Sequence, residues 1–184
     1  MKKFNILIIL FFISLFLNSC AQTTKLTNGT KVLSKKFKNT SKFDASTLKN
    51  IDIDYFYEKV DFYMADKNFN KIREIGSDTN RKIQFYKNGR VRFFSLGIEG
   101  ANPKNAGRRG IIFTRDNSLV INSQTANQDG NLSVGTYKVK VLGEKIYLLD
   151  ISSTLFFKPS QYMCYEYVKT YKIPEDWKKY SADW

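Results

Sequence analysis

The stretch KIQFYKNGRVRFF, residues 82–94, carries the clearest signal for the fold of this chain. Two runs rich in β-branched and aromatic residues flank the dipeptide formed by Asn88 and Gly89. Asparagine and glycine suit the two positive-φ positions of a type I′ turn, whose twist matches that of two paired strands. The stretch therefore predicts an antiparallel β-hairpin with a type I′ turn.

The chain beyond this hairpin repeats the alternation of short strands and turns, with no long amphipathic helix pattern after Arg81. Closely spaced turn signals are typical of an antiparallel sandwich or barrel. The sequence therefore predicts an all-β fold, an antiparallel β-barrel or sandwich of eight to nine strands, and allows a short C-terminal helix. The expected elements are a strand–turn–strand unit over 109–125 around Asp116 and Asn117, a turn over 126–133, a second unit over 135–151 around Gly143 and Glu144, and a last strand over 161–173 that Pro174 stops.

Residues 51–64 combine a strand period with a change of frame. Apolar residues alternate with polar ones from Ile51 to Tyr57, and the apolar frame then shifts to Val60. A β-bulge inserts one residue into a strand and requires such a shift. We therefore favour a bulged strand here, with a helix beginning at Ser46 as the alternative.

Four acidic residues lie in or near this stretch of an otherwise basic chain: Asp52, Asp54, Glu58 and Asp61. Carboxylates of this kind can bind calcium. A strand with one face in water also places acidic residues at alternating positions, and we favour that explanation. The stretch NQDGN, residues 127–131, lacks the repeated acids and closing glutamate of a calcium loop, so it predicts a hairpin turn.

The first twenty residues have the pattern of a secretory signal, with a positive start, an apolar run over 6–17 and small residues afterwards. The run is too short for a transmembrane helix, which takes about 20 apolar residues. Its end, Leu17-Asn18-Ser19-Cys20, resembles the lipobox of bacterial lipoproteins. This resemblance implies cleavage before Cys20, lipidation of its thiol and a lipid-anchored domain in the cell envelope, facing the periplasm or the surface. Ala21, where an aspartate tends to retain such proteins in the inner membrane, implies the outer membrane.

These patterns divide the chain into three parts: a signal peptide over 1–19, a lipidated cysteine with a flexible tether over 20–43, and one β-rich domain over 44–184. The tether is rich in lysine, threonine, serine and asparagine, a composition typical of flexible segments. Within it, residues 31–37 have the pattern of a first short strand.

Composition narrows the range of functions. The formal net charge of +13 is what a nucleic-acid-binding protein would carry, but the basic residues are scattered in pairs and an exported protein meets little nucleic acid, so we expect no such partner. The chain contains no histidine, which excludes Ser-His-Asp and Cys-His catalysis and histidine-ligated metals. With Cys20 lipidated, Cys164 has no disulfide partner, and we expect it to be a buried structural thiol. An enzyme that uses paired carboxylates or an activated lysine stays open as a third hypothesis. No such pair stands out by its spacing, so we expect no catalytic residue, metal or cofactor.

Residues 82–173 resemble the lipocalin-like small lipoproteins of bacteria. The resemblance rests on FYKNGRV (85–91), on the run Gly135-Thr-Tyr-Lys-Val, and on GEKIYLL (143–149) before a tyrosine-rich last strand. It implies an antiparallel barrel that binds a ligand or has another role in the envelope, and it does not imply catalysis.

We accordingly expect a small apolar or amphipathic ligand inside the barrel. The arginine pair at 108–109 belongs to an expected glycine-rich loop over 95–110 and suits an anionic group on the ligand, although a solubilising loop would also contain it. The alternative is a structural or assembly lipoprotein that docks onto an envelope protein complex, with a filled core. The candidate ligand-binding residues are Phe85, Phe93, Phe113, Tyr137, Arg108 and Arg109.

Overall fold

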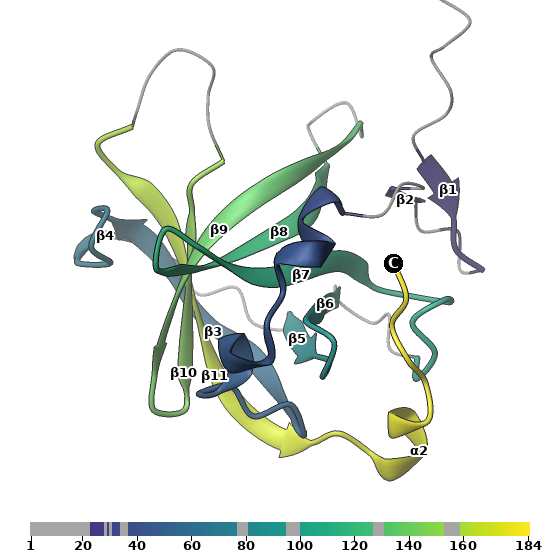
Figure 1. The fold of residues 1–184 in the computed structure, drawn as a ribbon. Helices are drawn as coiled ribbons and strands as arrows, with labels where there is room; N and C mark the ends of the chain where they lie inside the picture. The colour runs from purple at the N-terminus through teal and green to yellow at the C-terminus, as the bar shows by residue number, and fades with distance from the viewer. Residues whose placement is uncertain are drawn as a thin grey trace, which may run out of the picture.

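Eight antiparallel strands close into a barrel, and a ninth strand extends one edge, which confirms the predicted fold class (Figure 1). The structure is a computed structural model, and it describes residues 23–27, 29, 31–33, 37–76, 81–94, 100–126, 131–152 and 159–184. The barrel strands are β3 (Tyr55–Ala65), β5 (Lys82–Phe85), β6 (Arg90–Phe94), β7 (Arg108–Arg115), β8 (Ser118–Ala126), β9 (Leu132–Leu142), β10 (Lys145–Asp150) and β11 (Tyr162–Lys172), and the added strand is β4 (Lys71–Gly76).

The barrel closes where β3 pairs with β11, in a register that runs from Ala65 opposite Tyr162 to Tyr55 opposite Lys172. The other side of β3 is shared, because its first part pairs with β5 and its last part with β4. Between Lys59 and Asp61 the register against β11 shifts by one residue, so Val60 is the inserted residue. The predicted bulge is confirmed, and bulges of this kind add the local bend that a closed sheet needs.

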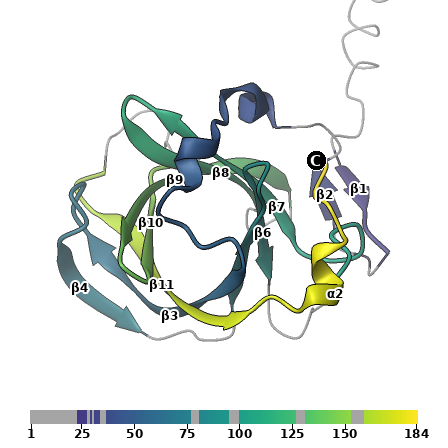
Figure 2. The ribbon, with the colours of Figure 1, turned by 60° about the horizontal axis from the view of Figure 1, so that its bottom comes forward.

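The segment before β3 differs from its prediction. Residues 51–54 are not part of the strand, which begins at Tyr55, and the alternative helix is only the 3₁₀ turn η2 (Ala45–Leu48). Ile51 instead packs among buried residues of the barrel interior, with Ile53 and Phe43 beside it. Figure 2 shows this dark blue segment lying across one end of the barrel. We call residues 43–54 the plug, and the end that they cover the plugged end.

The hairpin over 82–94 is confirmed, but its turn type was predicted wrongly. Gly89 has a φ of 75°, whereas Asn88 is not in the positive-φ region. The Gly89 N–H donates to the Tyr86 carbonyl at 2.9 Å, and the Tyr86 N–H donates to the Arg90 carbonyl at 2.9 Å. This is a three-residue loop with one left-handed glycine.

Both positive-φ positions of a two-residue turn occur instead at the next hairpin, where Asp116 has a φ of 50° and Asn117 a φ of 56°. Tertiary contacts explain why the first loop is longer. The Phe43 ring of the plug packs directly against Gly89, and the Gly89 carbonyl accepts a hydrogen bond from the Ile112 N–H at 2.9 Å. The tip of the hairpin is therefore shaped by the plug and by β7.

The described part of the expected tether packs on the barrel, which differs from the prediction of a flexible segment over 20–43. Strand β2 (Lys31–Leu33) confirms the predicted first short strand and pairs with β1 (Thr23–Lys25). Val32 is fully buried, and the Gln124 side-chain amide of β8 donates to the Lys31 carbonyl at 2.7 Å. Phe37 is also buried, just before the short 3₁₀ helix η1 (Lys38–Lys42). Cys20 lies outside the described residues.

After β11 the chain returns along the outer wall of the barrel. The helix that the sequence allowed is present as α2 (Glu175–Lys178), and residues 174–184, which we call the strap, follow the wall to the C-terminus. Trp177 packs against the rings of Phe56 and Phe94, and Trp184 is buried against Phe113. Both tryptophans of the chain therefore anchor the strap.

Replacing Gly89 by alanine tests how far the plug depends on this hairpin. A Cβ atom there would lie 2.2 Å from the Phe43 ring, whereas one on Gly143, which also has a positive φ, meets nothing within 4 Å. We expect Gly143→Ala to lower the free energy of unfolding by about 1 kcal/mol, the cost of the left-handed conformation. Gly89→Ala adds the clash and is expected to cost about 2 to 4 kcal/mol. Equal losses in urea unfolding would show that Phe43 does not constrain Gly89.

Candidate functional site

The end of the barrel opposite the plug holds a small cavity of about 80 Å³. Phe93, Tyr137 and Arg108, three of the residues predicted to bind a ligand, line it together with Arg81 and Tyr165. Burial raises the pKa of Tyr137, and the nearby Asp150 carboxylate raises it further, while Arg108 and Arg81 act in the opposite direction. The sequence therefore identified part of a real cluster of aromatic and basic side chains.

The other three predicted residues lie elsewhere. Phe85 is in the filled part of the interior, with its ring 5.7 Å from Tyr57 in an edge-on contact. Phe113 and Arg109 lie on the outer wall, beneath Trp184. Successive residues of a strand point to opposite faces, so Arg108 and Arg109 cannot both face the interior. The arginine pair, predicted in a loop, lies in β7, and the predicted ligand-binding residues are divided between two faces of the sheet.

The interior is too full for the ligand that the sequence led us to expect. Small-molecule sites typically measure about 300 to 1,000 Å³, well above the 80 Å³ found here. Buried apolar side chains from the barrel strands and the plug occupy the rest of the described interior: Ile51, Tyr57, Ile83, Phe85, Val91, Ile112, Ile121, Val139, Ile146 and Leu148. A bulky apolar ligand has no space there.

A larger cavity lies outside the barrel, under the strap. It measures about 400 Å³, within the range of small-molecule sites. We call it the strap groove. Its walls come from the plug, the tip of the β5–β6 hairpin and the strap: Ile53, Asp54, Gln84, Phe85, Tyr86, Lys87, Asn88, Ile173, Trp177, Lys178, Lys179, Tyr180, Ser181 and Ala182.

Contacts at its two ends hold the strap in place over this groove. At one end Trp177 makes an edge-on contact with Phe56, with ring centroids 5.5 Å apart. At the other end the Asn88 side-chain amide donates to the Ala182 carbonyl at 2.6 Å, and the Trp184 indole N–H donates to the Gly110 carbonyl at 2.8 Å. The groove therefore lies between two sets of contacts that hold the strap against the barrel wall.

The groove combines apolar walls with hydrogen-bonding groups. Ile173 and Phe85 are buried in its walls, and Gln84, only 4% exposed, accepts a hydrogen bond from the Tyr86 hydroxyl at 2.9 Å. Burial raises the pKa of Tyr86 to about 12, so its hydroxyl stays neutral and remains a donor at neutral pH. A few placed polar groups on an apolar wall are characteristic of sites that orient a small molecule.

Three lysines line the groove, and they are not equivalent. Lys178 forms ion pairs with Asp54 at 3.0 Å and Glu175 at 2.9 Å, so its charge is already compensated. Within the described part of the chain, Lys87 and Lys179 have no carboxylate partner; Lys179 only approaches the Tyr180 ring, at 5.2 Å. The groove thus carries two uncompensated positive charges, one from the hairpin tip and one from the strap.

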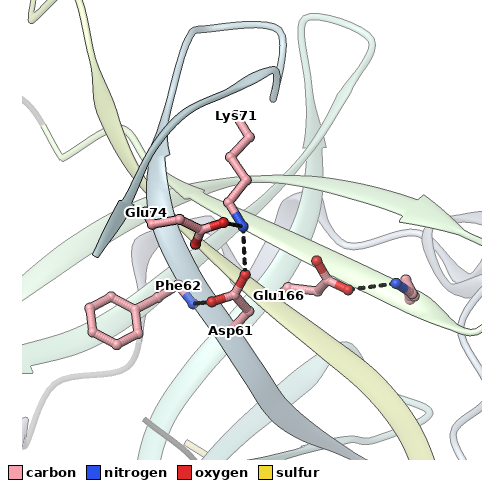
Figure 3. A network of polar contacts seen from close by, with 6 residues as sticks. Asp61, Phe62, Lys71, Glu74 and Glu166 are labelled. Carbon is pink, nitrogen blue, oxygen red and sulfur yellow. Dashed lines mark hydrogen bonds and ion pairs between the residues drawn. The ribbon is translucent and has the colours of Figure 1, made fainter. Parts of the chain in front are cut away.

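The four acidic residues noted in the sequence are each paired with a lysine. Asp52 lies 3.8 Å from Lys169, Glu58 lies 3.5 Å from Lys82, and Asp54 binds Lys178. Figure 3 shows the fourth, Asp61, which binds Lys71 at 2.9 Å and accepts a hydrogen bond from the Phe62 N–H. All four carboxylates are thus paired at the surface, but the strand alternation that we favoured applies at most to Glu58 and Asp61, because Asp52 and Asp54 precede β3 and belong to the plug.

Asp61 also lies directly opposite Glu166 in the β3–β11 register, so two carboxylates meet on one wall. The repulsion is offset because Glu166 binds Lys145 at 2.7 Å, while Lys71 serves both Asp61 and Glu74. These two acceptors raise the pKa of Lys71. In the described ranges no group of three or more acidic, histidine or cysteine residues is arranged to hold a metal ion.

Three comparisons, with models of protein families, with curated protein sequences and with solved structures, found no match to this chain. Within the part of the chain that the structure describes, no helix has the length and apolar character needed to cross a bilayer.

Cys164 allows a test of the expected structural thiol. It is fully buried on β11, and burial raises its pKa to about 11. The thiolate is the reactive form, and the fraction of Cys164 in that form increases only as the pH rises toward this pKa. We therefore expect Ellman's reagent at pH 8 to react far more slowly with folded residues 21–184 than with the same chain in guanidinium. Comparable rates in the two states would contradict a buried structural role.

Proposed function

We propose that this protein is a lipid-anchored lipoprotein of the cell envelope that binds a small amphipathic anion in the strap groove. The observation that carries the proposal is the groove itself, a cavity of about 400 Å³ with apolar walls and two uncompensated lysines, Lys87 and Lys179. Ligand binding was the function favoured by the sequence, and we propose the strap groove on the outer wall as its site in place of the barrel interior.

The groove fits an anion with an apolar body. Ile53 and Trp177 are partly exposed and offer apolar surface, and burying such surface contributes about 25 cal/mol per Å². Lys87 and Lys179 offer positive charge from different walls of the groove. The Gln84 side chain and the Tyr86 hydroxyl, which are hydrogen-bonded to each other at 2.9 Å, are the polar groups beside this apolar surface.

The small cavity at the end of the barrel opposite the plug supports binding of a small group only. Arg108, Arg81 and Tyr137 surround about 80 Å³, enough for a small polar group but not for a drug-sized molecule. A filled interior is also what the docking alternative requires. Docking interfaces are enriched in aromatic residues, however, and among the exposed large apolar side chains of the described residues only Tyr171 is aromatic; the others are Val60, Ile72, Ile75, Val134 and Leu142. Ligand binding therefore remains the better-supported function.

Titration with 1-anilinonaphthalene-8-sulfonate, an aromatic body carrying one sulfonate, tests the groove directly. We expect residues 21–184 to bind the probe with enhanced probe fluorescence and with quenching of tryptophan, because Trp177 lines the site. Reversing both unpaired charges with Lys87→Glu and Lys179→Glu is expected to weaken binding on the order of tenfold, about 1.4 kcal/mol.

The matched control is the pair Lys67→Glu and Lys104→Glu. Both lysines are exposed, and neither lines the groove, while the change in net charge is the same. Equal weakening by the two double variants would mean that the probe responds only to overall charge and would remove the groove as the site. Native mass spectrometry of protein taken gently from the envelope then identifies a natural ligand by its extra mass.

The anchor is tested separately through Cys20. The lipobox resemblance predicts that its thiol carries lipid and that cells fed an alkyne-tagged palmitate label the protein. Two or more acyl chains hold a protein stably on a bilayer. Cys20→Ser is therefore expected to abolish the label and the retention in the membrane fraction, whereas Cys164→Ser is expected to leave both intact. Labelling that survives Cys20→Ser would contradict the anchor.

A further inference from the structure

A cluster of arginines lies on the outer wall beneath the end of the strap. Arg92 of β6 stands opposite Arg109 of β7 in the register, and Arg90 is two residues from Arg92 on the same face. Arg90 and Arg109 are therefore diagonal neighbours, a placement in which long side chains reach one another. Burial lowers the pKa of all three guanidinium groups, yet arginine does not lose its proton in proteins.

Arg92 shows how the fold satisfies a buried guanidinium. It is fully buried, and its nitrogens donate to four backbone carbonyls of one loop, those of Gly100, Ala101, Asn102 and Ala106, at 2.7 to 3.3 Å. A guanidinium with so many acceptors stays buried at little cost. Arg92 therefore needs no further partner.

Arg90 and Arg109 lack such partners. Five buried side-chain atoms have no hydrogen-bond partner among the described residues, and three of them are Nε and Nη1 of Arg90 and Nε of Arg109. Arg90 is only 7% exposed. Neither arginine forms an ion pair within the described ranges; Asp183 is the carboxylate that affects the pKa of both. A buried charge without a partner is strongly destabilising.

The strap roofs this cluster with fixed contacts. The indole of Trp184 lies over the Arg109 guanidinium at 5.6 Å and is held by the Gly110 carbonyl, while Asn88 holds the Ala182 carbonyl. The roof limits what can enter, because a bulky molecule would displace residues 182–184. A small ion with several acceptor oxygens would satisfy the unpaired nitrogens, since guanidinium groups bind oxyanions through paired hydrogen bonds.

We propose that a small oxyanion of the phosphate or sulfate type binds between the guanidinium groups of Arg90 and Arg109, beneath residues 182–184. This site is separate from the strap groove, since neither arginine lines that cavity. The two sites share the strap, and the bound ion fixes its last residues. A phosphate on a lipid head group has the same chemistry, but the roof over a side chain that is 7% exposed favours the free ion.

Thermal unfolding of the full-length protein in a nonionic detergent, titrated with inorganic phosphate, tests this site. A ligand that binds only the folded state raises Tm in a saturable way. We expect such a rise with phosphate and a smaller one with sodium chloride at the same ionic strength. In ¹H–¹⁵N spectra we expect the Nε–H signals of Arg90 and Arg109 to shift with phosphate while that of Arg115 does not. Equal effects of the two salts on Tm, or static Arg90 and Arg109 signals, would overturn the proposal.

Two variants with opposite expected effects complete the test. Arg90→Gln is expected to abolish the phosphate-dependent rise in Tm, and the exposed Arg115→Gln is expected to retain it. Asp183→Asn changes an exposed residue and removes the negative charge nearest the site, so it is expected to tighten phosphate binding severalfold. Unchanged affinity in Asp183→Asn would count against the site even where Arg90→Gln fails to fold. If the dye fails to bind in the strap groove while phosphate still binds at Arg90 and Arg109, only the proposed function is contradicted.

Discussion

The fold depends on the pairing of β3 with β11, since this ladder turns an open sheet into a barrel. An open sheet of this composition would leave two edges with unpaired backbone groups, which invite association with other chains. Closure removes those edges and also forces the strands to curve, and the inserted Val60 supplies part of that curvature. The ion pairs of Asp61 and Glu166 lie on this same ladder, so charge compensation accompanies the closure.

Closure determines where space remains in the molecule. The ring of eight strands is narrow enough for side chains to fill it, as is usual for small barrels. The plug closes one end, and aromatic and basic side chains leave only a small cavity at the other. The larger cavity arises where the strap crosses the tip of the β5–β6 hairpin, because Trp177 and Trp184 hold its ends while its middle stands off the wall.

Local sequence patterns predicted the strands, turns and helix better than the tertiary contacts that these elements make. The hairpin over 82–94, the bulge at Val60 and the helix after Pro174 follow from turn residues, period and proline, all of which act over a few positions. The turn type did not, because the contact of Gly89 with Phe43 joins distant segments. Ile51 and Ile53 have a strand period but enter the barrel as part of a plug, since periodicity reports burial and not the partner.

The candidate site was only partly visible for the same reason. Phe93 and Tyr137 were found as aromatic residues of strands, but Phe113 was placed on the wrong face because the register of β7 is a property of the sheet. The arginine pair was predicted in a loop, whereas both arginines belong to β7 and point to opposite faces. The strap groove is made by contacts between residues nearly a hundred positions apart, such as Asn88 with Ala182. One signal was available in the sequence, because both tryptophans lie near its end, at 177 and 184. Such large aromatic side chains are usually buried, so they indicate a segment that packs on the domain.

The long span of the closing ladder also has a consequence for biosynthesis. Tyr55 of β3 pairs with Lys172 of β11, so more than a hundred residues separate the two halves of the seam. Contacts this distant in sequence make folding slow. The edge of β3 that faces β11 must stay unpaired until β11 has left the ribosome. During that interval the nascent chain has one half of a β-seam in solvent, and protection by a holding chaperone is most valuable then.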